Sequence, residues 1–129
     1  MNGTPKIEPA RLSDWLLYEE DDIGRYSRET VTVAGGQNLK CGSVVGLTGD
    51  GTQYVEYTNL PPDGADAVGI VINPIVTEVG TPGKTVIIAR HARIAKSGLA
   101  WGVTINQTAK DEALVDLATK GIIAVPAEA

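Results

Sequence analysis

Short strand-like segments, separated by turns that contain glycine or proline, dominate the sequence from Gly24 onward. Gly35-Gly36 ends the first segment, the Gly49-Asp50-Gly51 turn ends the second, and residues 61–65 (PPDGA) form a turn after the third. Glycine and proline supply the backbone angles that tight turns need, so they mark where a chain reverses direction. Their spacing along this chain predicts a strand-rich body.

The strand-like segments differ in how they are expected to be buried. In the first, residues 24–33, apolar Val31 and Val33 alternate with polar side chains, which is typical of a strand with one buried face. The fourth is a nearly continuous apolar run and is predicted to be buried, with Pro74 bending it or placing it at a sheet edge. The strand regions after the first cover residues 39–47, 53–60, 67–79, 84–95 and 122–126.

One helix is predicted, over about residues 109–120 (AKDEALVDLATK). Thr108 is expected to cap its start, and Gly121 to end it. Asp111 and Glu112 suit the positive end of the helix dipole. No internal repeat is visible, so we expect a single helix packed on a strand-rich core. The apolar stripe of this helix is formed by Ala113, Leu114, Leu117 and Ala118.

Residues 1–23 differ from the rest of the chain and are predicted to form a flexible N-terminal arm, with the β-rich domain over residues 24–129. Their one apolar cluster is Trp15-Leu16-Leu17-Tyr18, which the acidic run from Glu19 to Asp22 follows. A short helix from Ser13 to Glu20, capped by Ser13, is one alternative, and a disordered terminus is the other. Trp15 and its leucine neighbours argue against a purely solvating tail, because such tails are poor in these residues.

Composition and charge exclude several kinds of partner. The chain is 43% hydrophobic but has no Phe, so its core must be built from Val, Ile, Leu and Ala. The net charge of −5 argues against nucleic-acid binding by phosphate neutralisation. The single Cys41 excludes an internal disulfide, and no apolar run approaches the ~18 residues of a membrane span. We therefore expect no nucleic acid or membrane as a partner, and use without secretion.

The sequence GTPGKT at residues 80–85 contains the Gly-Lys-Thr of a phosphate-binding loop. Such a loop needs four residues between its glycines and a helix after its lysine, so that backbone amides converge on phosphate. Here only two residues separate Gly80 from Gly83, and a strand-like sequence follows. We interpret this stretch as a turn.

No other constellation indicates catalysis, a metal or a cofactor. Cys41 precedes an apolar strand and is expected to be a small buried side chain. His91 is the only histidine and is expected at the surface or in an interface. The run from Glu19 to Asp22 lacks the alternating oxygen ligands and central glycine of a calcium loop, so we interpret it as solvated acid. The sequence predicts that the protein is not an enzyme.

The order of segments resembles the head decoration protein family of tailed bacteriophages, of the lambda type. The resemblance covers roughly residues 18–126, in order and at compatible spacings. It rests most on Ser27-Arg28-Glu29-Thr30 before Val31-Thr32-Val33, and on Asp63-Gly64 before Ala67-Val68-Gly69-Ile70. Leu99-Ala100-Trp101 and the closing Gly121-Ile122-Ile123 add to it. The N-terminal stretch is longer and more acidic than in the lambda-type pattern.

This resemblance implies a small β-rich domain, barrel- or sandwich-like and of the β-tulip type, with little helix. It implies homotrimers on the outside of the expanded capsid in the virion, after assembly in the host cytoplasm. Members cement neighbouring major capsid proteins around three-fold positions and resist the pressure of packaged DNA. Their N-terminal segments become ordered on the shell and pair with capsid-protein strands. The partners implied are the major capsid protein and other copies of this chain, without a cofactor.

Two sets of residues follow as candidate contacts. We hypothesise that residues 13–33 bind the capsid, because a strand-like, aromatic-bearing segment lies there outside the core pattern. Arg90 and Arg93 lie in a stretch without acids, between Glu78 and Asp111, and are candidates for the trimer contact or for an acidic neighbour. Ordinary solvated charge is the alternative for both arginines. The capsid-binding candidates are Trp15, Leu16, Leu17, Tyr18, Tyr26, Arg28, Thr30 and Thr32.

Two other classes of function stay open at this point. A free β-barrel or sandwich module that binds a glycan or small ligand would need a cleft with clustered aromatic side chains, and the chain has only two Trp and four Tyr. A small hydrolase or redox enzyme would need Cys41 or His91 at its centre. Both alternatives fit the residues less well than the decoration family does.

Overall fold

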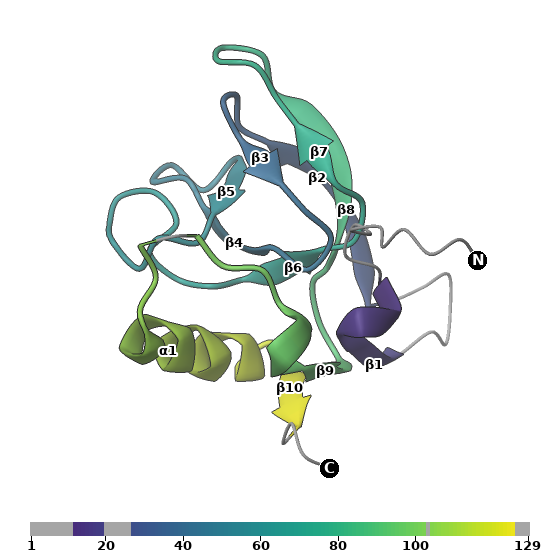
Figure 1. Ribbon diagram of the computed structural model, residues 1–129. Helices are drawn as coiled ribbons and strands as arrows, with labels where there is room; N and C mark the ends of the chain where they lie inside the picture. Colours follow the sequence, from purple (N-terminus) through teal and green to yellow (C-terminus); the bar gives the residue numbers. More distant parts are fainter. Residues whose placement is uncertain (1–11, 20–26, 103, 126–129) are drawn as a thin grey trace, which may run out of the picture.

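The computed structural model describes residues 12–19, 27–102 and 104–125, in which ten strands, two 3₁₀ turns and one α-helix form two layers (Figure 1). A β-barrel lies above a lower layer of three strands and the helix. The elements, in chain order, are η1 (Leu12–Asp14), β1 (Leu16–Glu19), β2 (Arg28–Val33), β3 (Asn38–Leu39), β4 (Val44–Leu47), β5 (Tyr54–Glu56), β6 (Gly69–Val71), β7 (Ile75–Val76), β8 (Gly83–Ile88), β9 (Ala92–Ala95), η2 (Lys96–Gly98), α1 (Gln107–Ala118) and β10 (Ile122–Val125).

The barrel closes in the order β2-β5-β4-β6-β8, and its longest pairing joins β2 to β8 in antiparallel register from Arg28↔Ile88 to Val33↔Gly83. The short β3–β7 ribbon lies at one end of it. Alternation along β2 turns its valines inward, as the sequence predicts. Closure pairs the strand edges with one another, so the barrel is sealed. Its interior is filled by Val31, Val33, Leu39, Val45, Val71 and Ile87.

The lower layer consists of the sheet β1-β9-β10, with α1 beside it (Figure 1). β9 is its central strand, antiparallel to β1 and parallel to β10. A second apolar cluster lies between this layer and the barrel and contains residues from both. Because this second cluster joins the two layers, we expect them to unfold together. Among the members of this cluster are Trp15, Val44, Tyr57, Ile70, Ile88, Ile94, Leu117 and Ile122.

The predicted helix is confirmed, two residues earlier than expected, at Gln107–Ala118. Thr108 as its N-cap was wrong: Asn106 is the cap, and its Oδ1 accepts a hydrogen bond of 2.9 Å from the amide of Ala109. Gly121 follows the helix with φ of +80°, a conformation in which glycine is favoured. The buried stripe is narrower than expected: Ala109, Ala113 and Leu117, spaced four residues apart, are buried, whereas Leu114 is half-buried and Ala118 is exposed.

Three predicted strand regions each divide into two strands. The region 39–47 contributes Leu39 to β3 and Val44–Leu47 to β4, with a turn at residues 41–42 between them. The apolar run at 67–79 breaks around Pro74 into β6 and β7, as expected from a residue that cannot donate to a sheet ladder. The region 84–95 crosses from the barrel to the lower layer, because β8 ends at Ile88 and β9 begins at Ala92. His91 has φ of 51° at this crossing. One continuous strand-like sequence thus serves both layers.

The helix considered for Ser13 to Glu20 was wrong, because the chain there forms the η1 turn and then β1. β1 pairs with β9, and Trp15 before it is fully buried. Leu12–Glu19 therefore packs on the body in this structure. The domain division at residue 23 stays a prediction.

Candidate functional site

β1 is the candidate attachment strand, because it lies at the edge of the open sheet. Within the described residues it pairs with β9 on one side and with no strand on the other. Its pairing places Leu16 opposite Ile94 and Tyr18 opposite Arg93, so the register shifts by one residue at Leu17. Such a bulge turns two consecutive side chains outward. Leu17 and Tyr18 are accordingly 54% and 55% exposed.

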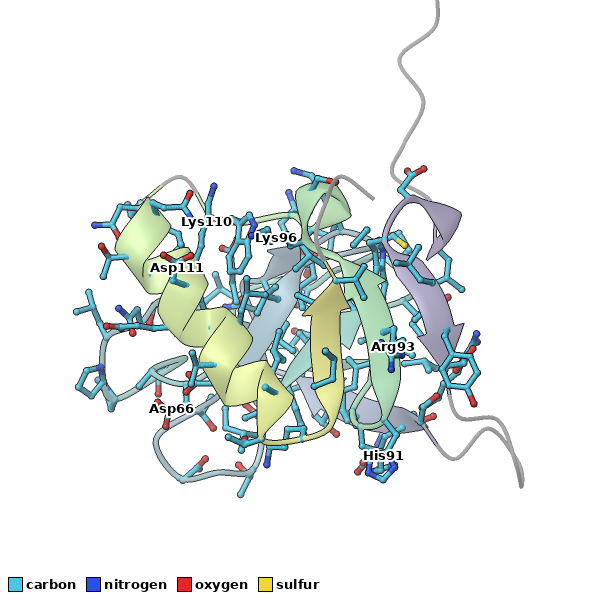
Figure 2. The ribbon with its side chains drawn as sticks, turned by 90° about the horizontal axis from the view of Figure 1, so that it is seen from below. Asp66, His91, Arg93, Lys96, Lys110 and Asp111 are labelled. Atoms are coloured by element: carbon cyan, nitrogen blue, oxygen red, sulfur yellow. The ribbon has the colours of Figure 1, made fainter. Side chains whose placement is uncertain are left out.

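The outer face of this sheet carries an aromatic, a cationic and an aliphatic side chain side by side. In register, Arg93 on β9 lies opposite Tyr18 on β1 and opposite Ile123 on β10. All three are exposed, and Arg93 forms no ion pair with another described residue. Figure 2 views this face, with Arg93 labelled on β9. We call Leu17, Tyr18, Arg93 and Ile123 the sheet face.

Trp15 lies on the opposite side of β1 from the sheet face and anchors it. Its side chain is 0% exposed, and its Nε1 donates to Sγ of Cys41 over 3.4 Å. Its carbonyl accepts a 2.7 Å hydrogen bond from the amide of Ala95. The prediction that Cys41 is a small buried side chain is confirmed. Trp15, expected among the capsid contacts, is in this conformation part of the core.

Glu19 fastens the other end of β1 to the barrel. Its Oε1 accepts a 2.6 Å hydrogen bond from the buried hydroxyl of Ser27 and one of 2.9 Å from Nε of Arg28, while Nη2 of Arg28 lies 2.6 Å from its Oε2. Hydrogen bonds in which the donor or the acceptor is ionised are stronger than those between neutral groups. The interpretation of Glu19 as solvated acid was therefore wrong, because only 13% of its side chain is exposed. Residues 20–22 of the acidic run, and Tyr26, lie outside the described residues.

The remaining capsid-binding candidates lie apart from the sheet face. Arg28, Thr30 and Thr32 are on β2, in the wall of the barrel, where every residue from Arg28 to Val33 pairs with β8. Thr30 is exposed, and Thr32 accepts a 3.4 Å hydrogen bond from Nζ of Lys84. Of these three side chains, only Arg28 is tied to β1, through Glu19.

The two candidate arginines have different surroundings. Arg90 follows β8 and forms an ion pair with Glu29 of the barrel, at 32% and 46% side-chain exposure. Arg93 belongs to the sheet face. Sequence reasoning grouped these residues, but only Arg93 lies beside Leu17 and Tyr18. Ile123 was missed as a surface residue because its neighbour Ile122 is equally apolar and is buried.

The described residues contain no group of three or more His, Cys, Asp or Glu side chains that would hold a metal ion. His91 is exposed, as expected. A turn at residues 78–81, closed by a 2.9 Å hydrogen bond from the amide of Thr81 to the carbonyl of Glu78, precedes β8, which begins at Gly83. The GTPGKT sequence is therefore a turn followed by a strand, as interpreted, and no helix follows its lysine. Across the described part of the chain, no helix is long and apolar enough to cross a membrane.

The fold and this surface define a small structural β-barrel protein with an open sheet. A comparison with protein-family models matches residues 5–122 to the bacteriophage lambda head decoration protein D family. Because the match covers most of the chain, this protein belongs to that family. It is a family of structural phage head proteins rather than enzymes, and membership assigns the chain to the capsid of the phage virion. No curated protein sequence matches the chain significantly.

Proposed function

We propose that this protein binds the outside of the expanded phage head as a homotrimer and reinforces it against the pressure of packaged DNA. Its partner in this proposal is the major capsid protein, which neighbouring copies cement around three-fold positions. Family membership supports the capsid as the binding target. The single observation that carries the mode of attachment is the position of β1 as an edge strand of the described sheet, with Leu17 and Tyr18 exposed on it.

The open edge suits strand addition. A sheet edge presents unpaired amides and carbonyls, to which an extended capsid segment can hydrogen-bond as a further strand. Main-chain bonds of this kind supply affinity without selecting a sequence, and neighbouring side chains select the register. Leu17 and Tyr18 lie where such a strand would contact them. The β2 candidates are less suited, because β2 already pairs with β8 along its length.

Arg93 is the charged member of the sheet face and is proposed to contact an acidic group, either on the shell or on a neighbouring copy. Arg90 is proposed to act through Glu29, its ion-pair partner, since its guanidinium is engaged there. An exposed ion pair of this type contributes about 0–1 kcal/mol. We therefore expect charge reversal to affect binding more at Arg93 than at Arg90.

Attachment through three copies compensates for a weak single contact. Fixing an extended segment costs about 1–2 kcal/mol per residue in backbone entropy, so one pairing strand binds weakly. A trimer presents three such strands at once, and each bound strand raises the effective concentration of the others. Sedimentation equilibrium of the free protein tests this step, with a mass of about three times 13.5 kDa expected.

Co-sedimentation of the purified protein with empty heads of its own phage, before and after expansion, tests the proposed function. We expect binding to expanded heads, near one copy per capsid-protein subunit. Absence of binding to both forms would reject the proposal and return attention to a ligand-binding module. Arg93→Glu and Arg90→Glu form a matched pair for the same assay.

A deletion that tests the N-terminal segment in capsid binding must keep the residues that pack on the body. Removing residues 1–23 would also remove Trp15 and Glu19, so loss of binding would not distinguish attachment from unfolding. Removing residues 1–11 leaves β1 and its anchor in place. Wild-type binding of this deletion is expected if residues 13–33 are the capsid-binding element. Wild-type binding of Tyr18→Ser would contradict the proposed contact at β1.

A further inference from the structure

A pocket of about 330 Å³ lies at the end of the lower layer, between η2 and the first turns of α1. Lys96 comes from η2 and Lys110 from α1, and Figure 2 shows both at the same end of this layer. Trp101, Leu99 and Leu114 provide its apolar lining. Ligand pockets span roughly 300–1,000 Å³, so this one is at the small end and suits one or two side chains.

Tyr57 holds the apolar wall of the pocket in place. The ring of Trp101 meets that of Tyr57 edge-on, with centroids 6.2 Å apart and an interplanar angle of 69°. Tyr57 is buried, and its hydroxyl donates a 3.0 Å hydrogen bond to the carbonyl of Ala109 in the first turn of α1. Burial, and next the nearby Asp116, raise the pKa of Tyr57 to about 12, so it remains a donor at neutral pH. One residue thus positions both Trp101 and the start of the helix.

The backbone beside Leu99 is fixed as well. Ala100 forms a parallel bridge with Ser43, and its amide donates a 2.9 Å hydrogen bond to the carbonyl of Gly42. The pocket is therefore formed before any partner arrives, which lowers the entropy that binding must overcome.

The charge of the pocket is opposite to that of the whole protein. Its charged lining residues are Lys96 and Lys110, in a chain of net charge −5. Neither lysine forms an ion pair with another described residue. The ammonium of Lys110 lies 5.8 Å from the ring centroid of Trp101. Asp111, the residue after Lys110, accepts a 2.9 Å hydrogen bond from Nε2 of Gln107.

We propose that this pocket receives an acidic side chain of the capsid, with an apolar neighbour of that side chain against Trp101. The inference rests on the proposed function, since the partner is the same shell, and it adds a second contact beyond the strand edge. Two ammonium groups attract a carboxylate, and Trp101, Leu99 and Leu114 bury the apolar atoms next to it.

The lining favours a peptide carboxylate over a phosphate. Phosphate is bound best by converging backbone amides or by the planar fork of arginine. At the start of α1, the amide of Ala109 already donates to Asn106 Oδ1, and that of Lys110 to the carbonyl of Asn106, so these donors are occupied. No arginine lines the pocket among the described residues. Lysine and an apolar wall suit a carboxylate on a short aliphatic stem.

Single charge reversals test the proposal on expanded heads of the protein's own phage. We expect Lys96→Glu and Lys110→Glu each to weaken binding roughly tenfold at low salt, and by less at high salt because screening shortens the range of the charges. Lys40→Glu is the matched control: Lys40 is exposed, as Lys96 is, whereas Lys110 is half-buried, and Lys40 lies outside the pocket. The substitution changes the net charge by the same amount as each pocket variant.

The outcomes separate this inference from the proposed function. If wild type binds and both pocket variants bind as Lys40→Glu does, the pocket proposal is overturned and capsid decoration stands. If wild type does not bind, both fail.

A direct titration gives a second readout on the intact protein. Hexaglutamate is added to ¹⁵N-labelled protein, and the indole N–H signals are followed by NMR. We expect the Trp101 signal to shift and the signal of buried Trp15 to stay constant, with the shift abolished in Lys110→Glu. Equal shifts in wild type and in Lys110→Glu would contradict a carboxylate site, and a comparable shift with inorganic phosphate would contradict selectivity for carboxylates.

Discussion

The barrel and the open sheet are built from the same kinds of residues, but they differ in whether their strand edges are paired. In the barrel, β2-β5-β4-β6-β8 closes on itself, and one set of its apolar side chains fills the interior while another, including Val44, Ile70 and Ile88, packs against the lower layer. In the sheet β1-β9-β10, one face packs on the shared core while the other exposes Leu17, Tyr18 and Ile123. Closure removes edges, whereas an open sheet keeps them. Within the described residues, the sheet therefore has edge strands, whereas the barrel has none.

Besides the apolar cluster between the layers, two contacts hold β1 to the rest of the molecule. Trp15 fills the space below the barrel, and Glu19 joins the end of β1 to the start of β2. Attachment through β1, as proposed, requires this strand to stay on the body under load. We expect these contacts to matter more for stability than any side chain of the sheet face.

The largest expected effect comes from Trp15→Ala. Removing a fully buried indole leaves a cavity between the two layers and costs about 3–5 kcal/mol of unfolding free energy. Urea denaturation followed by circular dichroism measures it. Leu17→Ala, two residues along and 54% exposed, is the control and is expected to change stability by less than about 0.5 kcal/mol. Similar values for the two variants would mean that the sheet is not anchored through Trp15.

A smaller effect is expected from Glu19→Gln. The amide keeps the shape of the side chain but loses the charge that Arg28 and the buried Ser27 hydroxyl engage, at a cost of about 1.5–3 kcal/mol. Glu29→Gln breaks the exposed pair with Arg90 and is expected to cost about 0–1 kcal/mol. Denaturant midpoints of both variants test the difference, and a larger loss at Glu29 would reverse the assignment of Glu19 as the fastening residue.

The unfolding free energy at alkaline pH tests the environment of Tyr57, which lies between the two layers. Its pKa is raised to about 12 by burial and then by Asp116, so the folded protein holds this proton more tightly than the unfolded chain does. Stability from this group is fully present below pH 10 and declines as the pH rises from about 10 to about 12, by an amount on the order of 2 kcal/mol. The stability difference between wild type and Tyr57→Phe, measured across this range, isolates the effect. An unchanging difference would contradict the raised pKa.

The smallest effect on stability is expected from Tyr18→Ser on the sheet face. Tyr18 is 55% exposed, so the unfolding free energy should change by less than about 0.5 kcal/mol. Binding to expanded heads should nevertheless weaken. A variant that lost stability and binding together would mean that the sheet face is structural.

Most of the barrel was predictable because its signals are local. Alternation along β2 and the turn residues between segments depend on neighbours one to four positions away. The helix was predictable within two residues for the same reason. Its cap was not, since Asn106 and Thr108 are both good caps and only packing of Ala109, Ala113 and Leu117 selects the register.

The N-terminal segment shows where local reasoning stops. Trp15-Leu16-Leu17-Tyr18 has neither a clear period of two nor a helical one, and its bulge at Leu17 exists only because β9 pairs with it. Whether Trp15 faces a partner or its own core depends on a space formed by residues more than 25 positions away, beginning with Cys41.

Composition, turn spacing and the order of segments were enough to predict a β-rich body with one helix and membership of the decoration family. These features depend only on residue type and on residues close together in the sequence. Which strands close into a barrel and which remain an open sheet was decided by the tertiary structure. The tertiary structure also decided the burial of Trp15, the hydrogen bonds of Glu19 and the position of Lys96 and Lys110 in one pocket. Each depends on contacts between residues distant in sequence, and such contacts leave no periodic signal in either partner.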